Sequence, residues 1–232
     1  DDNQQYWVYA NADGTLASDG VVNISGTNYL FDWHGHLVTN DTLNGYYANK
    51  DGIVVTNKWI KTTAYSDESD EQKNQYWIYA GVDGSLASDS VVTINGVNYL
   101  FNSNRHLVTN DYYKLDEGYG TYFANQDGIV QVNKWDKYLD DGTVQWLYSK
   151  NDGTLAENEK LTIDGVTYIF GSNYQMVTNS KYSADYLEYY LDANGLIAVN
   201  KWNKDTDGSW IYSKADGTLA KSETLTIGNV KY

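Results

Sequence analysis

The chain has 232 residues, of which 23 are Tyr, 8 Trp and 4 Phe, and it contains neither Cys nor Pro. Without cysteine, disulfides, thiolate metal sites and cysteine nucleophiles are excluded. A formal net charge of −15, with only 16 scattered Lys and Arg, argues against nucleic acid and against an anionic membrane surface, and no apolar run reaches the roughly 20 residues needed for membrane insertion.

The first patterned segment begins at Trp7 and reads Trp-x-Tyr, four residues, then Gly-[Ser/Thr]-Leu-Ala. The same phrase returns at Trp77, Trp146 and Trp210, in steps of 70, 69 and 64 residues. A fixed period of this length is typical of repeat architectures. We therefore divide the chain into repeats at about 6–75, 76–145 and 146–209 and a partial repeat at 210–232, all within a single repeat module that spans 1–232.

Two further phrases follow in a fixed order inside each step. The middle phrase starts at Asn28 as Asn-Tyr-Leu-Phe and runs on to Val-Thr-Asn, and the last phrase starts at Tyr46 and ends in Asn-Lys-Trp. Copies of the middle phrase start at Asn98 and Thr167, and copies of the last phrase start at Tyr122 and Tyr189.

Each phrase consists of two short runs of alternating apolar residues around a turn. In the first and last phrases the turn is Asp-Gly or Asn-Gly, which predicts a β-hairpin with positive φ at both central residues. The middle phrase has His34-Gly35 in its first copy but Asn104-Arg105 and Asn173-Tyr174 in the others, which predicts a looser or bulged turn in those two copies. Ten hairpins result, with an eleventh beginning at the C-terminus.

The predicted hairpins cannot stand alone. One hairpin is marginally stable in water, so each must bury a face on its neighbours, which predicts an all-β solenoid with almost no helix. The polar segment 60–75 is expected to be an exposed insertion, because its counterparts 136–145 and 203–209 are shorter. Since Gly228 to Tyr232 repeat the start of an earlier segment, we expect the chain to be a fragment of a larger protein.

Segments such as Ile94 to Phe101, followed by Leu107 to Asn110, resemble the choline-binding and glucan-binding repeats (cell-wall-binding repeats) of Gram-positive surface proteins. The pattern covers essentially the whole chain and is closest to the glucan-binding repeats of glucansucrases. The resemblance implies a β-solenoid with about three hairpins per superhelical turn and aromatic ligand pockets between neighbouring hairpins. One difference is that the family's Thr-Gly-Trp is replaced by sequences such as Asn57-Lys58-Trp59, and a lysine beside the Trp would repel a quaternary ammonium ion.

Aromatic residues two apart in a strand share a face, so each Trp-x-Tyr forms a ledge on which the apolar face of a sugar ring can lie. A Trp, an Asn and a Lys from the preceding Asn-Lys-Trp can complete such a set. The carbohydrate-binding candidates are Trp59, Trp77, Tyr79, Asn57 and Lys58; Trp135, Trp146, Tyr148, Asn133 and Lys134; Trp202, Trp210, Tyr212, Asn200 and Lys201; and Trp7 with Tyr9. The alternative is that these aromatics form the core of a thin stack, and Tyr29, Tyr99 and Tyr168 in particular are expected to be structural.

The remaining motifs suggest no other chemistry. The three histidines, at 34, 36 and 106, flank turns and are predicted to have no metal or catalytic role. The Asp-Gly turns lack the spaced ligands of a calcium loop, with Asp205 to Gly208 the nearest approach. No nucleophile, metal or cofactor motif points to an enzyme.

The predicted function is therefore a non-catalytic carbohydrate-binding module that anchors a secreted or cell-surface protein to an α-glucan or cell-wall polysaccharide. Its predicted partner is the polysaccharide, and its oligomeric state is left open. The alternatives are a passive surface stalk or adhesion segment, or a choline-binding cell-wall anchor.

Overall fold

The computed structural model describes residues 5–63 and 75–232. Within these ranges the protein is all-β, as predicted: twenty strands pair into ten antiparallel two-stranded sheets, and the one helical element is a short 3₁₀ turn, η1 (Asp116–Gly118). Among the described residues there is no helix long and apolar enough to cross a membrane.

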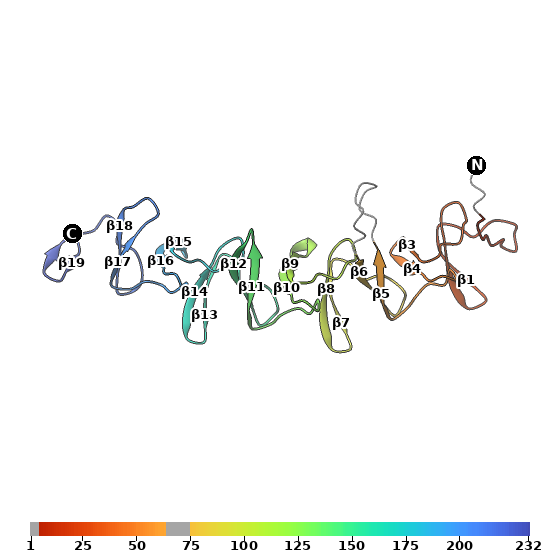
Figure 1. The fold of residues 1–232 in the computed structure, drawn as a ribbon, viewed down its shortest axis with the longest axis horizontal. Helices are drawn as coiled ribbons and strands as arrows, with labels where there is room; N and C mark the ends of the chain where they lie inside the picture. Colours follow the sequence, from red (N-terminus) through yellow and green to blue (C-terminus); the bar gives the residue numbers. More distant parts are fainter. Residues whose placement is uncertain (1–4, 64–74) are drawn as a thin grey trace. The chain divides into compact units, whose positions relative to one another are not determined.

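The chain folds into two compact units. Unit 1 contains residues up to 109 together with 115–118 and 126–129, and unit 2 contains 110–114, 119–125 and 130–232. Figure 1 shows the hairpins of unit 1 following one another in chain order. Its strands are β1 (Gly20–Ile24) with β2 (Thr27–Phe31), β3 (Asp41–Leu43) with β4 (Tyr46–Ala48), β5 (Lys58–Thr63) with β6 (Gln75–Ala80), and β7 (Ser90–Ile94) with β8 (Val97–Phe101).

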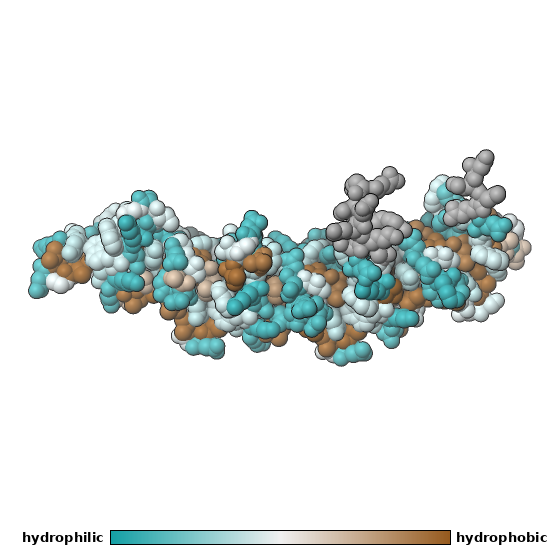
Figure 2. Space-filling view, viewed as in Figure 1, coloured by the Kyte–Doolittle hydropathy of each residue, from teal (hydrophilic) through white to brown (hydrophobic). Residues whose placement is uncertain are grey.

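Unit 2 is built in the same way. Its strands are β9 (Asp111–Lys114) with β10 (Thr121–Ala124), β11 (Lys134–Asp140) with β12 (Thr143–Ser149), β13 (Glu159–Ile163) with β14 (Val166–Phe170), β15 (Ser180–Ala184) with β16 (Leu187–Leu191), β17 (Lys201–Lys204) with β18 (Trp210–Ser213), and β19 (Thr226–Ile227) with β20 (Val230–Lys231). In both units apolar and polar surface are interspersed, as expected for thin hairpins (Figure 2).

The ten predicted turns lie where the sequence placed them, but the two-stranded ladders form at other turns. Strands β7 and β8 are joined by Asn95-Gly96, and both residues have positive φ (51° and 81°), as a type I′ turn requires. At the predicted turn Asp13-Gly14 only the glycine has positive φ (86°), and the Asp13 carboxylate instead accepts hydrogen bonds from the amide and hydroxyl of Thr15. Turns of this second kind are closed by a single β-bridge, such as Ala10 with Leu16. The ten predicted turns are therefore present as short bridged turns, and the longer ladders lie between them along the chain.

The middle turn keeps one geometry in all three copies, so the predicted difference between the first copy and the other two is absent. The amides of Gly35, Arg105 and Tyr174 donate to the carbonyl three residues earlier over 2.9–3.1 Å. Arg105 and Tyr174 adopt φ of 68° and 67°, close to the left-handed conformation that Gly35 adopts without strain. Most of the predicted insertion 60–75 falls at 64–74, outside the described residues; 60–63 end β5 and 75 begins β6.

Neighbouring hairpins are joined by recurring backbone contacts. The amide of Leu107 donates to the carbonyl of Trp77 in unit 1, and the amide of Met176 donates to that of Trp146 in unit 2, each over 2.8 Å. The core consists of small clusters shared by successive hairpins, such as Tyr79, Ile94 and Phe101 in unit 1. Stability summed over such local contacts is the behaviour of a repeat stack.

Candidate functional site

Unit 2 contains a hollow of about 600 Å³ at the junction of two hairpins. Its floor and walls include Trp135 from β11, Trp146 from β12, Tyr168 from β14 and Met176 from the following turn. Polar groups at its edge include Asn194. An open cavity lined by aromatic side chains with a few polar groups is the usual form of a small-ligand site.

Trp135 organises the aromatic side chains of this unit 2 hollow. Its ring lies 4.9 Å from Tyr168 at 77° and 6.3 Å from Trp146 at 88°, both edge-to-face arrangements. Its other neighbours are Tyr148 at 5.1 Å and the buried Phe170 at 5.7 Å. Such pairs lie within the favourable range for aromatic contacts, so Trp135 is held rigidly while Trp146, 38% exposed, faces solvent.

Unit 1 repeats the arrangement around a hollow of about 410 Å³ lined by Trp59, Trp77, Tyr99 and Leu107. The Trp59 ring lies 6.5 Å from Trp77 at 86° and 5.0 Å from Tyr99 at 73°. Trp77 is 44% exposed. Thr109 lines the unit 1 hollow as Thr178 lines that of unit 2, so the two sites share both aromatic geometry and a hydroxyl.

The two hollows differ in charge at one edge. Asp127 lines the unit 1 hollow, where the corresponding residue of unit 2 is the neutral Asn194. Both lie in the Asp-Gly or Asn-Gly turn of the last phrase. A carboxylate beside an aromatic floor favours cationic ligands, whereas an amide offers both a donor and an acceptor to a neutral ligand.

Several of the predicted site residues lie elsewhere. Tyr79 is 8% exposed and belongs to the core, and its hydroxyl donates to Asn57 Oδ1 over 2.7 Å. Lys58 is exposed, but alternation along β5 places it with Ile60, on the face opposite Trp59. Lys134 likewise precedes Trp135 and donates from Nζ to Gln131 Oε1 over 2.6 Å. None of these residues lines the corresponding hollow.

The asparagine of each Asn-Lys-Trp is a turn residue. Asn57, Asn133 and Asn200 have φ of 45°, 46° and 47°, in the left-handed region that asparagine tolerates better than most residues. The Asn57 amide donates to the carbonyl of Gly81, and the Asn133 side chain donates to Asn151 Oδ1 over 2.9 Å. The turn conformation and these hydrogen bonds explain why asparagine occurs at these positions, with no need for a bound ligand.

A different lysine reaches the exposed Trp. Lys61 pairs with Trp77 across β5 and β6, and Lys137 pairs with Trp146 across β11 and β12. The Lys137 Nζ lies 4.9 Å from the Trp146 ring centroid, and the Lys61 Nζ lies 5.9 Å from that of Trp77. Residues two apart in a strand lie on the same face, so the lysine two positions after Trp59 or Trp135 could have been identified from the sequence.

The third candidate set is only partly assembled. Trp202 lies 5.2 Å from Tyr212 and 5.1 Å from Tyr232, the counterpart of Tyr99 and Tyr168. Trp210 is exposed, and Lys201 is exposed on the strand face opposite Trp202. In the first set, Trp7 and Tyr9 are also exposed, and the Trp7 carbonyl accepts the amide of Leu37.

Tyr99, Tyr168, Leu107 and Met176 line the two hollows and were not among the predicted site residues. The two tyrosines were expected to be structural because each lies next to a leucine or isoleucine, and both do pack against core clusters. Alternation, however, turns the tyrosine to the opposite face from that aliphatic residue and toward the Trp of the preceding hairpin. A separate group of side chains, Asp32, His34 and His36, could hold a metal ion and lies outside both hollows.

Comparison with known proteins gives a consistent set of relatives. The chain is 28% identical over 224 residues to glucosyltransferase-S of Streptococcus mutans, a match that covers 93% of the chain and 14% of that protein. It is 23% identical over 241 residues to glucosyltransferase-I of Streptococcus downei, covering 98% of the chain and 13% of that protein. The chain thus spans only a small part of the curated relatives that it matches. No family model matches it.

Solved structures show the same fold. The choline-binding domain of CbpL from Streptococcus pneumoniae matches with a TM-score of 0.57 at 26% identity, covering 89% of this chain and 100% of that one. CbpJ from Streptococcus pneumoniae matches with a TM-score of 0.62 at 18% identity, covering 97% and 87% of the two chains. These neighbours match the choline-binding and glucan-binding repeat family, and the resemblance found in the sequence is confirmed.

Proposed function

We propose that this chain is a non-catalytic carbohydrate-binding repeat module that anchors a secreted or cell-surface protein to an α-glucan or a cell-wall polysaccharide. The observation that carries the proposal is the recurrence of one aromatic hollow in each unit, built from Trp59, Trp77 and Tyr99 and from Trp135, Trp146 and Tyr168. The same side chains in the same geometry, each with one Trp open to solvent, suit repeated contacts with a polymer.

The chemistry of the hollows fits a sugar ring. An exposed indole presents a flat apolar surface to the C–H face of a pyranose, and Thr109 or Thr178 with Asn194 offer hydroxyl and amide groups to its hydroxyls. Several weak sites on one chain gain roughly 10²–10⁴ in apparent affinity on a polymer through multivalency. The similarity to two streptococcal glucosyltransferases favours a glucan as that polymer.

The architecture that we propose is a β-solenoid with about three hairpins per superhelical turn. Bridges between successive hairpins support it: Tyr29 with Ile53 and Tyr99 with Ile129 in unit 1, and Tyr122 with Thr154 and Tyr189 with Thr218 in unit 2. Each bridge joins a hairpin to the next one along the chain, which is the contact pattern of a solenoid.

A choline-binding anchor is the second candidate. It is favoured by the similarity to the choline-binding domain of CbpL and by the carboxylate of Asp127 at the unit 1 hollow. The ammonium groups of Lys61 and Lys137 oppose it, because each lies near the indole that a quaternary ammonium ion would need. The passive stalk has no comparable support, since the exposed Trp77 and Trp146 each line a hollow.

Affinity electrophoresis in gels containing dextran, other α-glucans or purified cell-wall polysaccharide tests the proposal. Retardation in one gel that is lost in Trp77→Ala and Trp146→Ala is the expected result. The matched control is Trp33→Ala, which removes a 72% exposed Trp from outside both hollows. Equal migration with and without every polymer would reject glycan binding, and retention on a choline resin would then favour the second candidate.

A further inference from the structure

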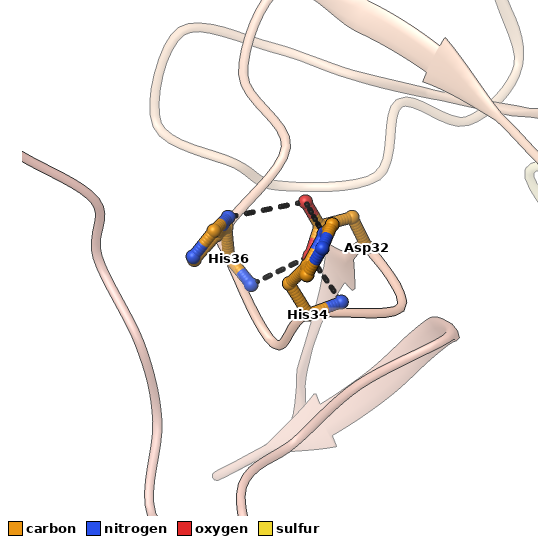
Figure 3. Close-up of side chains that lie close together, drawn as sticks. All are labelled: Asp32, His34 and His36. Carbon is orange, nitrogen blue, oxygen red and sulfur yellow. Dashed lines mark hydrogen bonds and ion pairs between the residues drawn. The ribbon is translucent and has the colours of Figure 1, made fainter. Parts of the chain in front are cut away.

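A five-residue turn after β2 brings three side chains with metal-binding atoms together. Asp32, His34 and His36 each offer one such atom, and all three atoms lie within 4.8 Å of one another (Figure 3). Asp32 Oδ2 lies 3.3 Å from His36 Nδ1 and 3.9 Å from His34 Nδ1. The group therefore comprises one carboxylate and two imidazoles that converge from a single short loop.

The backbone of the turn fixes the carboxylate. Asp32 Oδ1 accepts hydrogen bonds from the amides of His34 and His36 over 2.9 and 2.8 Å, which leaves Oδ2 directed at the imidazoles. Oδ2 is therefore the carboxylate oxygen that faces both imidazole Nδ1 atoms.

The imidazoles are also held in place. The Tyr6 ring stacks on His36 at 3.9 Å and 12°, and the His34 ring lies against Trp33 at 3.3 Å. The two imidazoles are nearly parallel, at 16°, with centroids 5.4 Å apart. The His34 side chain is about half exposed and the others about a third, so solvent can reach the group.

We propose that Asp32, His34 and His36 bind a divalent transition-metal ion of the zinc type. Zinc bonds of about 2.0–2.2 Å to nitrogen and oxygen place tetrahedral ligands roughly 3.3 Å apart, which the Asp32–His36 pair already satisfies. His34 Nδ1 needs to approach Asp32 Oδ2 by about half an ångström, and the two imidazoles, whose ligand atoms lie within 4.8 Å, must close to the same spacing. Two imidazoles favour zinc or copper over calcium and magnesium, which take oxygen ligands. Water completes the coordination on the exposed side.

Comparison with the other copies of this turn shows which contacts are structural and which residues are specific to the proposed metal site. His106 corresponds to His36 and stacks on Tyr76 at 4.0 Å and 12°, so the Tyr–His stack recurs without a metal site. In that copy Asn102 replaces Asp32 and Asn104 replaces His34, yet Asn102 Oδ1 still accepts the His106 amide over 3.0 Å. The first copy alone has the carboxylate and the second imidazole. The sequence-based prediction of no metal role considered the histidines without Asp32.

Calorimetric titration of the whole chain with Zn²⁺, in a non-chelating buffer containing excess Mg²⁺, tests the site. One Zn²⁺ per chain is expected. Asp32→Asn and His34→Asn, which install the residues of the second copy, should weaken binding by at least the roughly 10–100-fold that loss of an outer-shell partner already costs. Zn²⁺ should also raise the unfolding temperature of the unmodified chain and not that of the variants.

The control variant is His106→Asn, which removes a histidine from the turn that lacks the ligand set and should bind Zn²⁺ like the unmodified chain. Circular dichroism checks that all variants fold. Excess Mg²⁺ occupies surface sites made only of carboxylates. If no Zn²⁺ binds in its presence, any Zn²⁺ bound without Mg²⁺ sits at such surface carboxylates, and the proposed site would be overturned. Equal binding by His34→Asn and the unmodified chain would overturn it as well.

Discussion

The ammonium group of Lys137 lies 4.9 Å from the centre of the Trp146 ring, across the paired strands β11 and β12. Lys61 and Trp77 repeat the relationship in unit 1 at 5.9 Å. In each hollow the exposed indole therefore already has a cation beside it. Such a contact stabilises a side-chain position by about 0.5–1 kcal/mol at exposed sites, and it places positive charge where a cationic ligand would bind.

Lys137→Ala should discriminate between a neutral and a cationic ligand. Removing the ammonium leaves the indole available, so we expect retention on a choline resin to increase while retardation by a neutral glucan changes by less than about threefold, equivalent to roughly 0.6 kcal/mol. The control is Lys134→Ala, which removes an equal charge from the opposite face of the same strand. Loss of glucan retardation in Lys137→Ala alone would show that this lysine contacts the sugar directly.

The two Trp residues of one hollow should respond differently to truncation. Trp135 packs on Tyr148 and the buried Phe170, so Trp135→Ala should lower the free energy of unfolding of unit 2 by about 3 kcal/mol or more. Trp146 is partly exposed, so Trp146→Ala should cost no more than about 1 kcal/mol and should remove ligand binding instead. Urea denaturation followed by circular dichroism measures the first effect. Equal destabilisation by both variants would contradict the division into a support and a contact residue.

The sequence predicted the repeat, the all-β class and the exposed Trp of each hollow, because these follow from period and alternation. It located the turns but not the strand ladders or the turn type, since Asp-Gly suits both a type I′ turn and the side-chain-capped turn that Asp13 forms with Thr15. It also chose Lys58 over Lys61, because adjacency in sequence was given more weight than the shared strand face. Tyr99 was not placed in the site, because alternation shows that it faces away from Leu100 but does not show which hairpin it meets.

A buried polar pair in unit 2 predicts a pH-dependent difference in stability. The hydroxyl of the buried Ser149 donates to Asp136 Oδ2 over 3.2 Å, and burial raises the pKa of Asp136 against the opposing charge of Lys134. A carboxyl whose folded pKa is raised contributes stability below its unfolded pKa of about 3.9, and that stability is lost as pH rises through the folded value. At neutral pH the charged form therefore costs free energy.

Asp136→Asn should remove that cost. The corresponding pair, Asn203 and Ser213, is already hydrogen-bonded from Asn203 Nδ2 to Ser213 Oγ over 2.9 Å, so the amide fits this position. We expect the variant to be more stable than the unmodified chain by about 1 kcal/mol at pH 7, with the difference disappearing below about pH 4. Urea denaturation across this range measures it. Asp141→Asn, in the exposed turn of the same hairpin, should change stability by less than about 0.5 kcal/mol.

The turn between β15 and β16 carries an avoidable backbone cost at Tyr186. Asp185 and Tyr186 have φ of 53° and 63°, and the equivalent turn between β13 and β14 uses Asp164-Gly165. A non-glycine residue in the left-handed conformation costs roughly 1–2 kcal/mol. The Tyr186 side chain is fully exposed, so it recovers little of this through contacts.

Tyr186→Gly should therefore raise the free energy of unfolding of unit 2. Relief of the left-handed backbone exceeds the greater unfolded-state entropy of glycine, about 0.5–1 kcal/mol, so a net gain of about 0.5–1 kcal/mol is expected. The reciprocal variant Gly165→Ala should lower stability by about 1 kcal/mol through the backbone alone, because an added Cβ there would meet no atom within 4 Å. Thermal unfolding of both variants measures the pair. A loss of stability in Tyr186→Gly would mean that the tyrosine makes a stabilising contact that outweighs its backbone strain.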